Sequence, residues 1–198
     1  MGHNPACTCS EGKWYKMETP HPREKQPPHQ PGEILCFFIR HAEAHPAVDG
    51  DDAARPLTKS GRHDARDIFS VLARTAPDIG AIFTSPLLRA RETAELLASA
   101  LRLEQEPEIT PLLASGGPAS YWIDLLRRHK NLPPCVAAVG HEPILGGWLS
   151  ELCFASGQSV LMKKCAIARV RIRWGGGAAH AELEGLYQPG FMRKIARF

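Results

Sequence analysis

The feature that most constrains the fold is an unbroken apolar run, Ile34 to Ile39, which is followed directly by Arg40 and His41. Alternation of apolar and polar residues is typical of a strand with one solvated face, whereas a continuous apolar run indicates a strand covered on both faces. Such strands occur in sheets that carry helices on each side. The run is far shorter than the roughly 18 residues of a membrane-spanning helix, so we expect no transmembrane segment.

The segments that follow alternate between strand-like and helix-like patterns. Residues 81–84 and 135–139 are two further short apolar runs, and they predict buried strands. Apolar residues recur at helical spacing in residues 65–73, in residues 90–101, after Pro118 and after Pro143. This alternation favours an α/β domain.

The last third of the chain has a different pattern. Between Ala168 and Trp174 apolar residues alternate strictly with arginines, and after three glycines a second alternating stretch continues to Leu183. This pattern predicts an antiparallel hairpin with one solvated face. We therefore expect a three-layer α/β/α sandwich with a mostly parallel central sheet and a C-terminal antiparallel hairpin.

The length of 198 residues is that of one ordinary domain with one core. Residues 1–33 hold six of the 17 prolines and few hydrophobic residues, so they predict a disordered or loosely docked arm. His3, Cys7 and Cys9 in this arm match no common zinc spacing, which favours a solvated tail over a metal site. We place the domain at residues 34–188 and expect a basic tail, packed or frayed, at residues 189–198.

Charge and cysteine usage exclude some classes of partner. The formal net charge of +3 is too small to imply nucleic acid or an anionic membrane as the obligatory partner. The start of the chain has no apolar export signal, so we expect a cytoplasmic protein. The six cysteines then fit buried thiols better than disulfides.

Three short polar motifs stand at the carboxyl ends of predicted strands, where open α/β sheets bind ligands. They are Arg40-His41-Ala42-Glu43, the segment from Ser85 to Ala94, and Gly140-His141-Glu142-Pro143. Together and in this order they resemble the histidine phosphatase superfamily, whose members share the phosphoglycerate mutase-like fold, and the resemblance spans residues 34–174. Arg55-Pro56-Leu57-Thr58, followed by Gly61, is similar to the phosphohistidine phosphatases of the SixA type.

The resemblance implies roles for four residues. His41 would be the nucleophile, Arg40 and Arg89 would bind phosphate, and His141 would complete the pocket, with no metal or cofactor required. These residue types suit phosphoryl transfer, because negative charge spreads over three equatorial oxygens and planar guanidinium groups match two of them at once. We expect Ser85 and Pro86 to begin the helix that carries Arg89. The N-terminal amides of this helix add positive charge to the site.

The protonation of the two histidines decides their chemistry. His41 must be neutral to attack, and nearby guanidinium groups lower its pKa. A backbone carbonyl bonded to its other ring nitrogen would fix the tautomer and the angle of attack. We expect His141 to hydrogen-bond a phosphoryl oxygen, with the option of carrying a proton when the site is occupied.

Other polar residues near the motifs have simpler interpretations. Arg91 and Glu92 are expected to be exposed on their helix, and Glu43 and Glu142 to be solvated or structural. The remaining histidines of the domain that the pattern places on the surface are His45, His63 and His180.

The segment after the second motif, residues 111–118, contains no carboxylate. Many members of the superfamily that hydrolyse phosphate esters supply a general acid from this segment, because an alkoxide leaving group needs a proton. The imidazole of phosphohistidine can take up its own proton near neutral pH, so the omission favours a phosphoramidate substrate. An acid from Glu43, Glu108 or Glu142 stays open.

The absence of a lid insertion predicts a shallow, open pocket. Such a pocket suits a phosphohistidine displayed on a partner protein of the phosphorelay or phosphocarrier type. The alternatives are a phosphatase for small phosphate esters or nucleotides and a catalytically silent phosphoprotein-binding module. A mutase is expected less, because holding a phosphoenzyme during substrate reorientation calls for an enclosed site.

Overall fold

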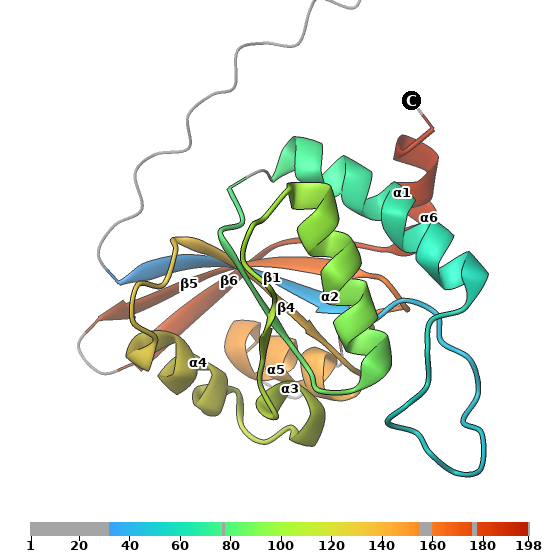
Figure 1. Ribbon diagram of the computed structural model, residues 1–198. Coiled ribbons are helices and arrows are strands. Elements are labelled where there is room, and N and C mark those ends of the chain that lie inside the picture. The colour runs from blue at the N-terminus through green and yellow to red at the C-terminus, as the bar shows by residue number, and fades with distance from the viewer. Residues whose placement is uncertain (1–31, 77, 155–159, 176–177, 198) are drawn as a thin grey trace, which may run out of the picture.

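The structure is a computed structural model that describes residues 32–76, 78–154, 160–175 and 178–197 (Figure 1). The predicted N-terminal arm, apart from its last two residues, lies outside the described residues, and so do His3, Cys7 and Cys9. In the part of the chain that is described, no helix is long and apolar enough to cross a membrane.

Six strands form one mixed sheet in the order β3-β2-β4-β1-β5-β6. Their bounds are β1 (Glu33–Arg40), β2 (Ala81–Thr84), β3 (Glu108–Ile109), β4 (Cys135–Gly140), β5 (Ile167–Gly175) and β6 (Ala178–Tyr187). The pairs β1–β4, β4–β2 and β2–β3 are parallel, whereas β5 is antiparallel to both β1 and β6. The predicted sheet and its C-terminal hairpin are therefore confirmed, and the short edge strand β3 is an addition.

The side chains of β1 explain why its run is apolar throughout. Leu35, Phe37 and Ile39 point into the hydrophobic cluster on one face of the sheet. Ile34, Cys36 and Phe38 point into the cluster on the other face. Because successive side chains of a strand alternate between the two faces, a strand with a core on each side needs apolar residues at every position.

Helices cover both faces of the sheet (Figure 1). One layer consists of α1 (Lys59–Thr75), α2 (Leu88–Leu101) and α6 (Pro189–Ile195), and the other of α3 (Leu112–Ser115), α4 (Ala119–Arg128) and α5 (Ile144–Cys153). This arrangement confirms the three-layer α/β/α sandwich. The basic C-terminal segment contains α6, whose Met192 is buried and whose Arg193 pairs with Asp64 of α1.

The hairpin has the solvated face that its alternation predicts. Val170 and Ile172 are buried against the layer of α4 and α5. The arginines that alternate with them, Arg169, Arg171 and Arg173, lie on the opposite face of the sheet and form ion pairs with Glu33, Glu182 and Glu184. Ion pairs at such a surface contribute little to stability, about 0–1 kcal/mol each, but they satisfy the charges of three adjacent arginines.

The thiols within the described residues are free, as expected. Cys36, Cys135 and Cys165 are buried, and Cys153 is half-buried. Burial raises the pKa of Cys135 and of Cys165 to about 12, so neither thiol forms an appreciable amount of thiolate at neutral pH.

Candidate active site

The register of the parallel strands brings the three motifs to one edge of the sheet. Arg40 of β1 is the register partner of Gly140 of β4, and Thr84 of β2 is the partner of Val139. The residues that follow these strands therefore leave the sheet side by side. The imidazole rings of His41 and His141, one hundred residues apart in the chain, have centroids only 4.9 Å apart.

A close approach of α1 to the loop after β1 explains Gly61, the glycine that follows the segment Arg55-Pro56-Leu57-Thr58. A Cβ atom on Gly61 would lie 2.2 Å from the carbonyl oxygen of Glu43, so no larger residue fits there. Thr58 caps α1 through its Oγ1, which accepts a hydrogen bond from the amide of Gly61 at 2.8 Å. The amide of Thr58 in turn donates to Glu43 O at 2.9 Å, which fastens the start of α1 beside His41.

His41 is held in one tautomer by the main chain. Its Nδ1 lies 2.7 Å from the carbonyl oxygen of Ala42. A carbonyl oxygen only accepts, so Nδ1 carries the proton and Nε2 of the neutral ring has the free lone pair. Burial, and to a smaller degree the charges of His141, Arg89 and Arg40, lower the pKa of His41 to about 3 despite the bond to Ala42. The ring is therefore neutral at physiological pH.

Main-chain carbonyl oxygens also anchor the two arginines of the site. Nη1 of Arg40 donates to Met162 O at 2.8 Å, and Nη1 of Arg89 donates to Asp52 O at 2.7 Å. Nη2 of Arg89 also donates to the carboxylate of Asp52 at 3.0 Å. The Nε atom of each arginine is buried and has no hydrogen-bond partner among the described residues. Buried donors without an acceptor are unusual and costly, so both guanidinium groups suit an anion at this position.

His141 presents a third such donor. Its Nε2 lies 2.8 Å from Oγ of Ser85, and that oxygen also accepts from the amide of Leu87 at 3.2 Å. We assign the Ser85 hydroxyl as the donor to Nε2, which places the proton of the neutral ring on Nδ1. Nδ1 is buried without a partner in the described part of the chain. Burial and the charges of Arg89 and Arg40 lower the pKa of His141 to about 4, against an opposing effect of Asp52.

The four predicted site residues therefore converge. The charges of Arg40 and Arg89 act on both histidine rings, whose centroids are 4.9 Å apart, and His41, Arg89 and His141 are each no more than 7% exposed. This arrangement can bind a tetrahedral oxyanion through three donors and bring a nitrogen nucleophile to its central atom.

Three contributors to the site were missed by the sequence interpretation: Asp52, Met162 and the hydroxyl of Ser85. Asp52 and Met162 lie in irregular segments whose residue types carry no signal of contact with an arginine. Ser85 was expected to cap a helix that begins at Pro86. Helix α2 instead begins at Leu88 with Leu87 as its N-cap, and the Ser85 hydroxyl contacts both the amide of Leu87 and Nε2 of His141.

The expectation for Glu92 was wrong, whereas Arg91 is exposed as expected. The side chain of Glu92 is only 14% exposed. Its Oε2 accepts from the amide of Leu57 at 2.7 Å, and its Oε1 accepts from Nη2 of Arg62 at 2.5 Å. Its position on α2 faces the loop before α1, so the carboxylate satisfies a backbone donor and a cation there.

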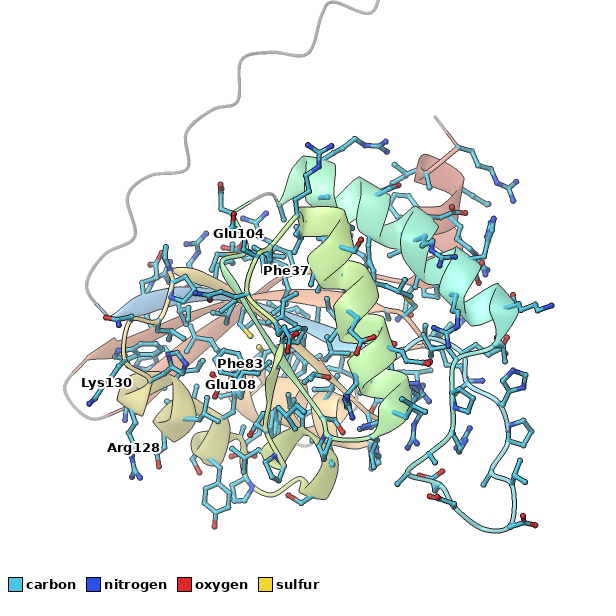
Figure 2. The ribbon with its side chains drawn as sticks, in the orientation of Figure 1. Phe37, Phe83, Glu104, Glu108, Arg128 and Lys130 are labelled. Carbon is cyan, nitrogen blue, oxygen red and sulfur yellow. The ribbon has the colours of Figure 1, made fainter. Side chains whose placement is uncertain are left out.

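The carboxylates considered as general acids are engaged elsewhere. Glu142 accepts from the amides of Met162 at 3.0 Å and Gly146 at 3.3 Å, which is the structural role expected for it. Glu108 lies on the edge strand β3, opposite Phe83 of β2 (Figure 2), and its Oε2 lies 3.0 Å from Nε2 of His129.

Glu43 pairs with Lys164 at 3.5 Å and accepts from the hydroxyl of Thr58 at 3.2 Å. Residues 111–118 include α3 and carry no carboxylate toward the site.

The remaining histidines and possible metal ligands add nothing to this site. His45, His63 and His180 are exposed, as expected. Across residues 32–197, outside the gaps in the description, no three His, Cys, Asp or Glu side chains gather in a way that could hold a metal ion.

A family model and a relative in sequence both identify the chain as similar to histidine phosphatases. The family model of the histidine phosphatase superfamily (branch 1) matches residues 36–114. The chain is 34% identical over 151 residues to an uncharacterized protein of Picosynechococcus, which covers 75% of this chain and 91% of that protein. It is 31% identical over 122 residues to the phosphohistidine phosphatase SixA of Escherichia coli, which covers 61% of this chain and 74% of that protein.

Solved structures share the fold. The protein histidine phosphatase SixA complexed with tungstate superposes with a TM-score of 0.67 at 24% identity, over 79% of this chain and 98% of that chain. The mycobacterial glucosyl-3-phosphoglycerate phosphatase superposes with a TM-score of 0.60 at 14% identity, over 79% and 99%. One fold thus carries both a protein phosphatase and a small-molecule phosphatase.

Proposed function

The chain belongs to the histidine phosphatase superfamily, and from this premise we propose that it is a metal-independent phosphatase that removes the phosphoryl group from phosphohistidine on a partner protein. The observation that carries the proposal is that Arg40, Arg89 and His141 each have a buried nitrogen without a partner among the described residues, in a site where the rings of His141 and His41 lie 4.9 Å apart and Nε2 of His41 has a free lone pair. Such donors stabilise the charge that develops on the equatorial oxygens of a transferring phosphoryl group.

In the first step Nε2 of His41 attacks the phosphorus atom in line with the leaving nitrogen. A bond forms between Nε2 and phosphorus, and the bond between phosphorus and the substrate imidazole breaks. The electron pair of the broken bond stays on the imidazole nitrogen, which takes up a proton from water. Arg40, Arg89 and His141 hold the three phosphoryl oxygens throughout.

In the second step a water molecule attacks the phosphoryl group on His41. The bond between phosphorus and Nε2 breaks, and its electron pair returns to the ring. The products are inorganic phosphate, which carries away both protons of the water, and neutral His41, whose Nδ1 keeps its proton and donates it in a hydrogen bond to the carbonyl oxygen of Ala42 at each stage. The bond from Nδ1 thus keeps the ring oriented for both steps.

The choice of a phosphoramidate substrate follows from the acids that the site holds. An ester would release an alkoxide that needs a proton, and a positioned acid is worth about 10²–10⁴ in rate. Asp52 reaches the site, but hydrogen bonds from Arg55 and Arg89 hold the pKa of its carboxyl below the ordinary value, so it stays ionised at neutral pH. The imidazole leaving group needs no acid from the protein. The relative SixA, which is named a phosphohistidine phosphatase, supports the same choice.

The test compares two substrates in the presence of EDTA: a phosphohistidine-bearing carrier protein and p-nitrophenyl phosphate. We expect rapid loss of phosphohistidine and slow ester turnover, both absent in His41→Ala. The matched control is His45→Ala, which removes an exposed histidine four residues away and leaves both rates unchanged. A radiolabelled phosphoenzyme that survives alkali and is lost in acid, formed by the wild type alone, identifies the intermediate on a histidine.

The other outcomes lead to the alternatives. Ester turnover as efficient as phosphohistidine turnover, with a bell-shaped pH profile, would assign the site to a small-molecule phosphatase with a general acid. Phosphate binding without turnover of either substrate would make the chain a binding module.

A further inference from the structure

We propose that Asp52 is a specificity-determining residue, whose carboxylate favours substrates with a neutral or cationic leaving group over substrates whose leaving group carries an anion. The proposal rests on the proposed function, because it assumes that the site at His41 transfers phosphoryl groups.

The position of Asp52 is fixed by two guanidinium groups. Oδ2 accepts from Nη2 of Arg89 at 3.0 Å, and Oδ1 accepts from Nη1 of Arg55 at 2.8 Å. The main-chain oxygen of Asp52 accepts from Nη1 of Arg89 at 2.7 Å, so backbone and side chain both hold the same arginine. Arg55 is itself fastened to the loop, because its Nε donates to His45 O at 2.6 Å.

The carboxylate is exposed, whereas the arginine that it contacts is buried. The side chain of Arg89 is 8% exposed, whereas that of Asp52 is 57% exposed. His41, His141 and Arg89 are buried, after β1, after β4 and in the first turn of α2, so a phosphoryl group carried on a protein enters from the solvent side. In-line attack by His41 places the leaving group on the side opposite Nε2, and under the proposal this group passes the carboxylate of Asp52 as it departs.

A fixed negative charge at this place discriminates by the charge of what passes it. Anionic leaving groups, such as those that bear a second phosphate or a carboxylate, are repelled by it. An imidazole that takes up a proton as it departs is attracted. The neighbouring Arg40, which has no carboxylate hydrogen-bonded to its guanidinium among the described residues, supplies the positive charge that holds the phosphoryl oxygens themselves.

Asp49 provides a matched control in the same loop. It is exposed, and its backbone has a φ of 51°, in the left-handed region that asparagine tolerates well. Asp49→Asn and Asp52→Asn therefore make the same change of net charge in one loop, and only the second removes the carboxylate on Arg89.

The experiment measures kcat/KM for two substrate series that differ only in the charge of the leaving group. The first holds phenyl phosphates with a para carboxylate, carboxamide or trimethylammonium group, and the second holds N-phosphorylated imidazole acetate, imidazole and histamine. Dividing each mutant rate by the wild-type rate cancels the intrinsic reactivity of each substrate. For Asp52→Asn we expect the anionic substrate to gain about tenfold relative to the neutral one, and the cationic substrate to lose by a similar factor.

Two further measurements separate charge from positioning. Asp52→Glu keeps the charge, so its ratios should return toward those of the wild type. High salt should reduce the preference of the wild type for cationic over anionic substrates, because it screens the carboxylate. The corresponding preference of Asp52→Asn should change little with salt. An equal loss on all three substrates in Asp52→Asn would overturn the proposal, because it would mean that Asp52 only orients Arg89. The same shift of ratios in Asp49→Asn would also overturn it.

The two series keep this inference apart from the proposed function. Charge selection among the phenyl phosphates, together with no turnover of the phosphoimidazoles, would contradict the phosphohistidine substrate and leave the role of Asp52 standing. Turnover of both series with flat ratios would do the reverse. Turnover of neither series would overturn both.

Discussion

The hydroxyl oxygen of Ser85 lies 2.8 Å from Nε2 of His141, and both side chains are buried at the ends of neighbouring strands. We assign the hydroxyl as the donor in this contact, and that assignment sets which nitrogen of the neutral His141 ring carries its proton. With Nε2 as the acceptor, Nδ1–H is a donor, and it is one of the buried donors that have no partner among the described residues. Ser85 is thus a positioning residue that acts through His141.

Replacement of this hydroxyl tests that role. We expect Ser85→Ala to lower kcat/KM by about tenfold, because one buried hydrogen bond worth about 1–1.5 kcal/mol is lost and the ring is free to take the other tautomer. ¹⁵N NMR of the imidazole nitrogens should show a protonated Nδ1 in the wild type and a protonated Nε2 in the variant. Ser70→Ala, at an exposed position of α1, should change neither. A protonated Nε2 in the wild type would refute the assignment.

The lowered pKa values of His41 and His141 make stability depend on pH. Both rings stay neutral in the folded protein down to about pH 5, with pKa values of about 3 for His41 and about 4 for His141, whereas in the unfolded chain they take up protons below about pH 6.5. The unfolded state then binds more protons, so the free energy of unfolding falls as pH decreases from 6.5, by about 2 kcal/mol per histidine at pH 5.

Urea denaturation at pH 7.5 and pH 5 measures this effect. The variant His41→Gln should lose about half of the pH dependence contributed by the pair, and His63→Gln, at an exposed position, should keep all of it. Equal pH dependence in the wild type and in His41→Gln would show that His41 is not buried in its neutral form.

Arg89 should not tolerate replacement by lysine. A lysine ammonium is a single point donor, and it cannot hold Asp52 through two nitrogens while it also binds a phosphoryl oxygen. We expect Arg89→Lys to lower kcat/KM by about 10²–10³ and to weaken competitive inhibition by tungstate in parallel. Arg91→Lys, two residues along α2 and exposed, is the control. Tungstate should inhibit this variant as strongly as the wild type. Unchanged tungstate inhibition in Arg89→Lys would remove Arg89 from the oxyanion site.

Glu92 should matter for stability and not for substrate choice. Its carboxylate bonds the amide of Leu57 and pairs with Arg62, and its side chain is mostly buried. Glu92→Gln should lower the free energy of unfolding by about 1–2 kcal/mol, because a charge-assisted hydrogen bond weakens and a half-buried cation loses its partner. Chemical denaturation of this variant beside Glu95→Gln, exposed on the same helix, measures the difference. Equal free energies of unfolding for Glu92→Gln and Glu95→Gln would show that the contacts of Glu92 do not stabilise the fold.

The amino-acid sequence by itself determined the parts of this protein that depend on local pattern. The apolar run from Ile34 to Ile39 predicts a strand with a core on each face, and alternation from Ala168 onward predicts the hairpin, because side-chain periodicity reports burial directly. The motifs after the strands resemble those of the histidine phosphatase superfamily, and that resemblance, rather than the spacing, selected Arg40, His41, Arg89 and His141. The motifs lie close together because parallel strands end at a common edge of the sheet.

Only the tertiary structure decided how those side chains are held. The proton on Nδ1 of His141 depends on Ser85, which is 56 residues away in the chain, and the anchoring of Arg89 depends on Asp52, at a separation of 37 residues. Arg40 is held by the carbonyl of Met162, which any residue type could supply. Hydrogen bonds of this kind are set by the meeting of loops in three dimensions, and no spacing within the sequence reports them, because neither partner has to be of one type or at one distance along the chain.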